Sequence, residues 1–245
     1  MFEWSKTVDV EWLCAGFAFA MPVSSALGSF DPDTVLDSEE RSQVERFLKR
    51  EDRERYRAAH GLVRLLLGAA TGQNPAGFRF SRRPGGKPFL SDAGTLDFNL
   101  SHGGDWVAVA LSRSGRIGID VEAERPRHFW DEIARSFLAP EEIATASAIG
   151  YLEIWTAKEA ALKAHGTGFA IPPDSLTVTA EGAGFVARLP EERFPGVWRR
   201  LDDGHVLAVA SDGSAPEITV LENAGDLRDS LADLSRFAPA RPASR

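Results

Sequence analysis

The stretch DFNLSHGGDWVAVALSRSGRIGIDVE, residues 97–122, predicts two chemically different sites on neighbouring strands. From 96 to 101, apolar and polar residues alternate with the period of a strand that buries one face and offers polar groups on the other. His102 ends that strand. The two glycines that follow leave the backbone N–H groups and the Ser101 hydroxyl free to approach a ligand oxygen. The sequence therefore predicts an anion site at this strand end, with a surface histidine at a turn as the alternative.

The second site comes from the last strand of the stretch, residues 117–122. Asp120 and Glu122 share one face of it, opposite two apolar side chains. Residues two apart on a strand lie about 6.5 to 7 Å apart, so both carboxylates can converge on one hard cation such as Mg²⁺. The alternative is that the pair lines the wet face of an ordinary half-exposed strand.

Composition is that of an ordinary globular protein. The 245 residues, 43% of them hydrophobic, can bury a full core as one large domain or as two small halves. No apolar run reaches the length of a membrane span and no signal peptide is recognisable, so we expect a cytoplasmic protein that binds no membrane. The net charge of −8 argues against general nucleic-acid binding. The single Cys14 is expected to be buried, and it excludes an intramolecular disulfide and a cysteine-based zinc site.

Ahead of the central stretch, the sequence predicts a strand region at 10–23 and two helices. Asp37 with Glu40 matches a capping box that opens the first helix. The buried stripe of that helix is expected to be Val44, Phe47 and Leu48. The second helix begins within the charged run KREDRERYR, residues 49–57. That run is either a solvated helix face with ion pairs or an arginine cluster for phosphate.

Between the second helix and the central stretch, the sequence predicts a short strand at 78–81 and a turn-rich loop, RRPGGKP, at 82–88. Lys87 stands in that loop between Gly86 and Pro88. It is either a solvated loop residue or part of a flat surface on which a ligand can lie against the backbone.

After the central stretch, we expect helices at about 131–136 and from Pro140, where Glu142 would suit the helix dipole. The helix YLEIWTAKEAALKAH, 151–165, is closed by a glycine. Glu159 falls on its apolar stripe, and Lys163 lies one turn further. These two form either a surface i, i+4 ion pair or part of a site in which Glu159 joins the two strand carboxylates around a metal. Strands are expected at 176–179, 185–189, 197–201, 206–210 and 218–221, followed by a loose tail from Asn223.

Four motifs together resemble the 4′-phosphopantetheinyl transferase family, in its longer, surfactin-synthetase-activating type: GKP at 86–88, FNLSH at 98–102, GIDVE at 118–122 and WTAKEAALKAHGTG at 155–168. The resemblance implies an α/β (α+β) fold of two similar subdomains, each a small, mostly antiparallel sheet packed with a long helix. It also implies a pseudo-twofold axis with the active site in the cleft between the subdomains. We expect subdomains at 1–116 and 117–222, a loose tail at 223–245, and a monomer.

The resemblance further implies an enzyme that moves the 4′-phosphopantetheine arm of coenzyme A onto a serine of an apo acyl or peptidyl carrier protein. The reaction releases adenosine 3′,5′-bisphosphate and requires Mg²⁺. The implied metal ligands are Asp120, Glu122 and Glu159. Lys163 would stabilise or protonate the leaving bisphosphate, and Glu142 falls near a glutamate proposed as the base in some members of the family.

The implied coenzyme A contacts lie mostly in the first half of the chain. Arg55 and His102 would hold the 3′-phosphate, and Lys158 matches the other lysine of the family's helix. The adenine would lie against Gly86, Lys87 and Pro88, with the Ser101 hydroxyl in the neighbouring strand. Where the family often has a serine after the histidine, this chain has Gly103.

Two other functions fit the same residues. A non-catalytic coenzyme A or nucleotide-binding module would keep Arg55, Lys87 and His102 without needing a metal triad. A Mg²⁺-dependent phosphohydrolase would use the same groups with water in place of serine.

Overall fold

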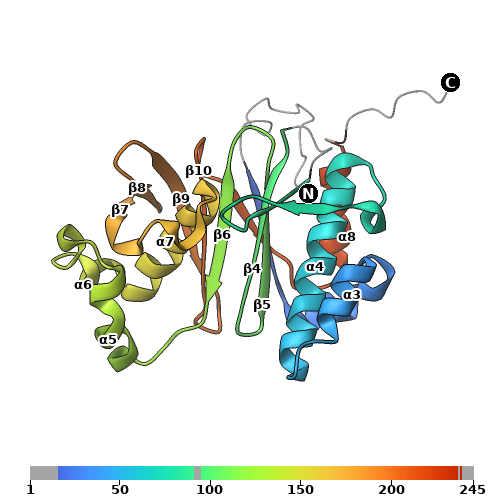
Figure 1. Ribbon diagram of the computed structural model, residues 1–245, viewed down its shortest axis with the longest axis horizontal. Coiled ribbons are helices and arrows are strands. Elements are labelled where there is room, and N and C mark those ends of the chain that lie inside the picture. The colour runs from blue at the N-terminus through green and yellow to red at the C-terminus, as the bar shows by residue number, and fades with distance from the viewer. Residues whose placement is uncertain (1–15, 91–94, 237, 239–245) are drawn as a thin grey trace, which may run out of the picture.

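The central stretch folds as three consecutive strands, as its alternation predicts. These are β4 (Asp97–Gly103), β5 (Trp106–Ser112) and β6 (Ile117–Glu122). The structure is a computed structural model that describes residues 16–90, 95–236 and 238, so the prediction for Cys14 falls outside the described residues. β4 and β5 form an antiparallel hairpin, whereas β6 belongs to a second sheet. In Figure 1 these strands stand in the middle of the molecule, with helices on either side.

The first sheet has the order β11-β1-β5-β4. β1 (Phe17–Pro22) pairs antiparallel with β5 and parallel with β11 (Glu217–Val220). The long helix α4 (Arg50–Thr71) packs on this sheet through a buried stripe that includes Ala59, Leu62 and Leu66. Short helices α2 (Val23–Ser29) and α3 (Ser38–Val44) lie beside it, and α3 begins with the predicted Asp37–Glu40 capping box.

The second sheet is antiparallel throughout and has the order β6-β10-β9-β8-β7. Its other strands are β7 (Thr177–Glu181), β8 (Gly184–Arg188), β9 (Arg193–Arg200) and β10 (Val206–Ser211). Helix α7 (Tyr151–His165) lies on β6 and β10, and α5 (Arg127–Phe137) and α6 (Ala146–Ile149) cover its outer side. Each half is therefore a mostly antiparallel sheet with one long helix, and the predicted α+β class is confirmed.

Side chains join the two sheets where β4 runs beside β6. The Asp97 carboxylate accepts a hydrogen bond from the Ile117 N–H at 2.9 Å, and the Asn99 side-chain oxygen accepts one from the Ile119 N–H at 3.0 Å. The polar face of β4 thus faces the seam between the sheets, where Asn99 is buried. At the end of the seam, a Cβ on Gly103 would overlap the Val121 carbonyl oxygen. The serine that the family often has here would therefore require the two strands to move apart.

The remaining elements connect these layers. A hairpin of β2 (Phe80–Arg82) and β3 (Pro88–Leu90) surrounds the RRPGGKP loop. The short 3₁₀ turns are η1 (Pro32–Thr34), η2 (Pro75–Gly77), η3 (Pro140–Glu142), η4 (Gly168–Ala170) and η5 (Pro173–Ser175). The helix expected from Pro140 is therefore the short η3, followed by α6. No helix in the described ranges is long and apolar enough to cross a membrane.

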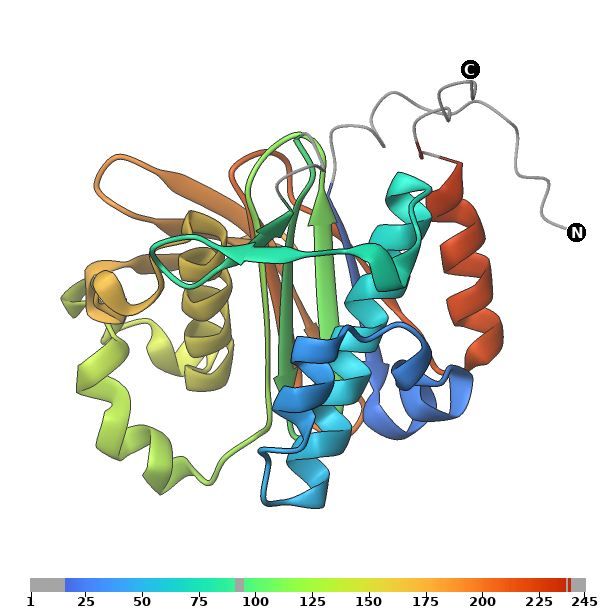
Figure 2. The same cartoon turned by 45° about the vertical axis from the view of Figure 1, so that its right-hand side comes forward.

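The expected loose tail is wrong over most of its described length. Residues Ala224–Ser235 form helix α8, which Asn223 caps and which packs along α4 through the buried Leu227 and Leu234 (Figure 2). β11 also returns to the first sheet, so the C-terminal end of the chain completes the N-terminal half. The signal was present, because Leu227, Leu231 and Leu234 have helical spacing behind a capping box formed by Asn223 and Asp226.

One core prediction in the first helix is also wrong. Leu48 is 97% exposed, because α3 ends at Val44 and the chain turns outward before α4 begins. Val44 is buried, and Phe47 packs against Tyr56 with ring centroids 5.3 Å apart. The helix is too short to place all three apolar side chains on one buried face.

Candidate functional site

A cleft of about 900 Å³ lies where the two halves meet. The first half contributes residues of α3, α4, the β2–β3 hairpin and β4, and the second half contributes residues of β6 and α7. Because both walls come from one chain, the cleft is formed without a second copy of the protein.

Three carboxylates converge on one end of the cleft: Asp120 and Glu122 from β6, and Glu159 from α7. One oxygen of Asp120, Oδ1, accepts hydrogen bonds from Ser101 Oγ at 2.9 Å and from Lys163 Nζ at 2.5 Å. The other, Oδ2, is buried without a hydrogen-bond partner in the described part of the chain, as is Oε1 of Glu159. Buried carboxylate oxygens are costly unless a partner satisfies them.

The charges at this end are incompletely balanced. Burial, and next the negative charge of Asp120, raises the pKa of Glu159 to about 7. Burial followed by Asp120 also raises the pKa of Glu122, partly opposed by the Trp155 indole N–H at 3.5 Å. Within the described ranges, no three His, Cys, Asp or Glu side chains are already arranged as a metal-ligand set. The two unpartnered oxygens and the raised pKa values nevertheless fit a divalent cation, because hard cations take oxygen ligands.

Lys163 belongs to the cleft and not to a surface ion pair. Its ammonium group lies 2.5 Å from Asp120 Oδ1 and 3.1 Å from Ser101 Oγ, and its side chain is 29% exposed. The alternative of a Glu159–Lys163 surface pair is therefore wrong. The structure brings together Ser101, Asp120, Glu159 and Lys163 from three elements.

The positive charges of Arg55 and Lys163 lie beside this end, close to His102, which lines the cleft and is exposed to solvent. The protein atoms around the ring displace part of its solvent, and this desolvation lowers the pKa of His102. The positive charges of Arg55, Lys163 and His60 act in the same direction. Arg55 stands on α4 with its guanidinium 3.6 Å from Asp52. This region can hold a ligand with negative charge.

The GKP loop meets the cleft through Pro88 alone of its three residues. The Lys87 ammonium is buried in the seam between the sheets, where it pairs with the Asp97 carboxylate and donates to the Ile117 carbonyl oxygen at 2.8 Å. Gly86 is in the left-handed conformation, with φ 86°, at the turn of the hairpin. Lys87 thus fixes the hairpin to the seam, and a ligand at this wall would meet Pro88.

Glu142 and Lys158 form a separate buried network under α7. The Lys158 ammonium lies 2.5 Å from a carboxylate oxygen of Glu142 and donates to three backbone carbonyl oxygens. Glu142 also accepts from the backbone N–H groups of Ala139 at 2.7 Å and Val178 at 2.6 Å. Neither side chain lines the cleft. Both are committed to holding α5, η3 and β7 against α7.

Sequence reasoning missed several cleft residues, among them a group on α4. Tyr56, His60 and Val63 line the cleft wall from α4, and Glu40 lines it from α3. The spacing of the three α4 residues places them on one helix face, which is a signal that the sequence contained.

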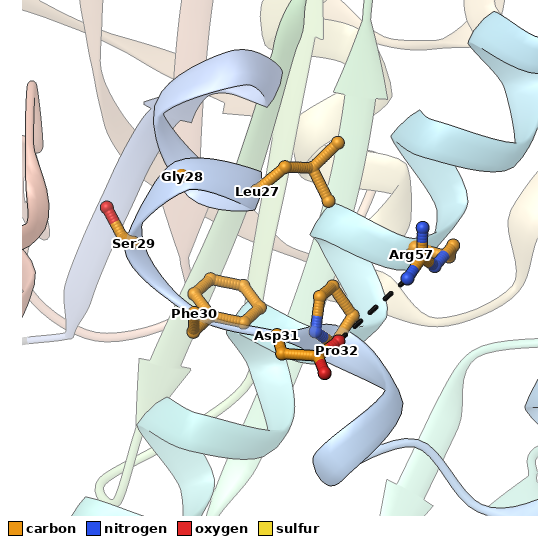
Figure 3. Close-up of a pocket in the computed structure, with 7 residues that line it drawn as sticks. All are labelled: Leu27, Gly28, Ser29, Phe30, Asp31, Pro32 and Arg57. Atoms are coloured by element: carbon orange, nitrogen blue, oxygen red, sulfur yellow. Dashed lines mark ion pairs between the residues drawn. The ribbon is translucent and has the colours of Figure 1, made fainter.

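A second hollow, of about 420 Å³, lies away from the cleft at the end of α2 (Figure 3). Asp31 and Arg57 are the charged residues of its lining, and their side chains lie 3.9 Å apart. Because these two charges face each other, this hollow offers less to a charged ligand than the cleft does.

Two family models match the chain. The model described as "4'-phosphopantetheinyl transferase, N-terminal" matches residues 32–114, and the "4'-phosphopantetheinyl transferase superfamily" model matches residues 116–210. A 4′-phosphopantetheinyl transferase of Bacillus subtilis is 30% identical over 191 residues, covering 75% of this chain and 84% of that protein. The chain belongs to the 4′-phosphopantetheinyl transferase superfamily.

Two further relatives support this assignment. The 4′-phosphopantetheinyl transferase Sfp of Bacillus subtilis strain 168 is 31% identical over 188 residues, covering 73% of this chain and 83% of that protein. A phosphopantetheinyl transferase of a Thraustochytrium species is 32% identical over 208 residues, covering 74% and 72%. The protein is thus a phosphopantetheinyl transferase, and the readings as a binding module or a phosphohydrolase lose their support.

The two family models meet between residues 114 and 116, in the turn that leads from β5 to β6. In this transferase, the first model covers the cleft wall with His102, and the second covers the wall with the three carboxylates. The wall with His102 and the carboxylate cluster therefore come from different halves, which the β4–β6 seam and a buried apolar cluster between the two sheets hold together.

Proposed function

We propose that the transferase binds coenzyme A in this cleft together with Mg²⁺ and transfers the 4′-phosphopantetheine group to a serine of an apo acyl or peptidyl carrier protein. The observation that carries the proposal is the pair of buried, unpartnered oxygens, Asp120 Oδ2 and Glu159 Oε1, in the same cleft as Lys163 and His102. Coenzyme A is polyanionic, so it suits a cleft with a cation-binding end beside a cluster of positive charge.

In the proposed reaction, the serine oxygen bonds to the phosphorus of the phosphopantetheine phosphate. The bond from that phosphorus to the bridging pyrophosphate oxygen breaks, and adenosine 3′,5′-bisphosphate leaves. Asp120, Glu122 and Glu159 would hold Mg²⁺, which would neutralise charge on the pyrophosphate. The serine proton must pass to a base or to water.

Lys163 would stabilise the negative charge that develops on the leaving bisphosphate, because its ammonium already lies at the carboxylate end of the cleft. His102 and Arg55 would contact the 3′-phosphate, Arg55 through a forked guanidinium. Pro88 would border the adenine. Because both cleft walls belong to one chain, we propose that the protein acts as a monomer, and the cytoplasm remains its predicted location.

Intact-mass analysis tests the proposal. Several apo carrier proteins are incubated with the enzyme, coenzyme A and Mg²⁺, and parallel reactions contain EDTA or the Asp120→Ala variant. We expect one carrier or more to gain a single phosphopantetheine, with the gain lost in both controls. Release of adenosine 3′,5′-bisphosphate without any carrier modification would instead indicate hydrolysis, and modification undiminished by EDTA would contradict the metal site.

A further inference from the structure

The cleft wall formed by α4 contains a second imidazole, that of His60, beside the region of His102. We propose that His60, held in place by Glu40 and Arg64, is a further binding residue for a phosphate monoester and gives the enzyme part of its preference for the 3′-phosphorylated form of coenzyme A. This inference rests on the proposed function, because it names one more contact for that substrate.

The Glu40 carboxylate fixes the orientation and the tautomer of the His60 ring. His60 Nδ1 lies 2.8 Å from Glu40 Oε1, and Glu40 is only 6% exposed. The other oxygen of Glu40 accepts from Arg64 Nε at 2.6 Å and from the Asp37 N–H at 3.1 Å. A carboxylate oxygen accepts hydrogen bonds, so Nδ1 is the nitrogen that donates to Glu40. Nε2 is left for a ligand.

Arg64 anchors this arrangement from inside the protein. Its side chain is completely buried, and it binds Asp37 Oδ2 at 2.8 Å and the Pro75 carbonyl oxygen at 2.8 Å, as well as Glu40. The Arg64 guanidinium therefore prevents Glu40 from turning away from the imidazole. This is how a buried neighbour positions a functional side chain without touching the ligand.

Tyr56 restrains the ring from one face. The Tyr56 and His60 rings are stacked, with centroids 3.9 Å apart and an interplanar angle of 19°. Burial, followed by the negative charge of Glu40, raises the pKa of Tyr56 to about 12, so its hydroxyl stays neutral. Between the carboxylate and the aromatic ring, the free edge of the imidazole is the part that can bind a ligand. His60 is 19% exposed at its side chain, as that role requires.

The surrounding charge favours a ligand with two negative charges. Glu40 holds the Nδ1 edge of the His60 ring, and the positive charges of Arg55 and Lys163 lie in the same region. A terminal phosphate monoester approaches two negative charges at neutral pH and offers three strong acceptor oxygens, whereas a pyrophosphate oxygen in the chain offers less charge. In the imidazolium form, Nε2–H of His60 would donate to such an oxygen, which makes a charge-assisted hydrogen bond.

Calorimetric titration tests the inference with coenzyme A and 3′-dephospho-coenzyme A as ligands. The proteins compared are the wild type, His60→Gln and the control His128→Gln, which changes an exposed histidine outside the cleft. We expect His60→Gln to weaken coenzyme A binding roughly tenfold or more, the usual effect of losing a hydrogen bond to a charged group. Binding of the dephosphorylated ligand should change less than about twofold, and His128→Gln should change neither.

Each other outcome also decides the question. If His60→Gln weakens the binding of both ligands equally, His60 only supports the fold. If it weakens the binding of neither, His60 is not part of the phosphate site. Failure of the wild type to bind coenzyme A would overturn the proposed function together with this inference. If the wild type binds coenzyme A and His60→Gln keeps its full preference for the 3′-phosphate, the inference alone fails.

Nuclear magnetic resonance of the wild type provides a second measurement that needs no variant. With ¹⁵N-labelled histidine, we expect the Nε2 resonance of His60 to shift on addition of adenosine 3′,5′-bisphosphate and much less with adenosine 5′-monophosphate. The exposed His128 serves as the internal control. A His60 resonance unchanged by either nucleotide would overturn the inference.

Discussion

At the residue scale, the functional cleft depends on which partner each charged side chain finds. Lys163 lies one helical turn from Glu159, yet its ammonium binds Asp120 of a different element. Glu159 consequently keeps a buried oxygen without a partner among the described residues. Glu159 and Lys163, although one helical turn apart, therefore have separate roles at the carboxylate end of the cleft.

Substitution of Lys163 tests its role in the transferase reaction. We expect Lys163→Ala to lower kcat by on the order of 10² or more, because a preorganised group that stabilises developing charge is lost. Coenzyme A binding should suffer less, since that charge develops mainly in the transition state. Steady-state kinetics at saturating Mg²⁺ measure both effects, with Lys163→Arg as the comparison that keeps the charge. A near-normal turnover of Lys163→Ala would show that the lysine only neutralises Asp120.

Glu159 gives a prediction about pH. Its pKa is raised from 4.5 to about 7 in the folded state. Between these two pH values, the folded state therefore keeps a proton that the unfolded state has released. The stability that this provides is complete below pH 4.5 and is lost as the pH rises to about 7. In EDTA, Glu159→Gln should therefore gain Tm relative to the wild type as the pH rises through this window and keep a constant advantage above it. Thermal unfolding from pH 4 to pH 8 would contradict this if the two curves stayed parallel.

At the scale of elements, the packing of α7 on β6 sets the distance between Glu159 and the two strand carboxylates. Gly118 makes that packing possible, because a Cβ at this position would overlap the Ala160 carbonyl oxygen and the Ala164 backbone nitrogen of the helix. The helix and strand meet through backbone atoms, which cannot rotate away as a side chain can. Their separation is therefore fixed closely.

We expect Gly118→Ala to destabilise the protein by about 3 kcal/mol, the upper range for inserting one methyl group into a packed core. Mg²⁺ should stabilise any folded fraction less than it stabilises the wild type, because α7 would be displaced from β6. Gly213→Ala is the matched control, since no atom lies within 4 Å of the position of its Cβ. Urea unfolding of both variants measures the difference, and similar midpoints would show that α7 can shift without cost.

At the scale of the whole molecule, the C-terminal elements of the described chain return to the first half. β11 adds a parallel strand beside β1, and α8 then packs along α4, so both ends of the described chain belong to the first half. The second half is an insertion between β5 and β11 in the order of the chain. Its position against the first half depends on the β4–β6 seam and on the buried apolar cluster that β1 and β5 form with β6 and β10.

Leu234→Ala should therefore destabilise the first half although it lies near the C-terminal end. Leu234 is 4% exposed within the core of α4, so we expect a cost of about 2–5 kcal/mol in the free energy of unfolding. Leu48→Ala removes the same atoms from a residue that is 97% exposed and should change stability by less than about 0.5 kcal/mol. Chemical denaturation of the two variants compares them directly, and equal effects would mean that α8 is dispensable.

Local patterns in the sequence were enough to predict most elements. The alternation in 97–122 became β4, β5 and β6, the capping box at Asp37 opens α3, and the helix expected at 151–165 is α7 to the residue. These features depend on neighbours within a few positions, which the sequence displays directly. The capped helix after Asn223 had the same kind of signal, which a composition rich in Ala, Pro and Arg obscured.

The sequence by itself determined the periodicity, the caps and the residue types that can bind a cation or an anion, because each of these follows from local chemistry. Only the tertiary structure decided that the polar face of β4 meets β6 and not solvent, and that Lys87 and Lys158 are buried and do not line the cleft. It also decided that His60 and Glu40 meet across 20 positions in the chain. A charged side chain takes whichever opposite charge the packing of distant elements brings within reach, and sequence spacing does not encode that choice.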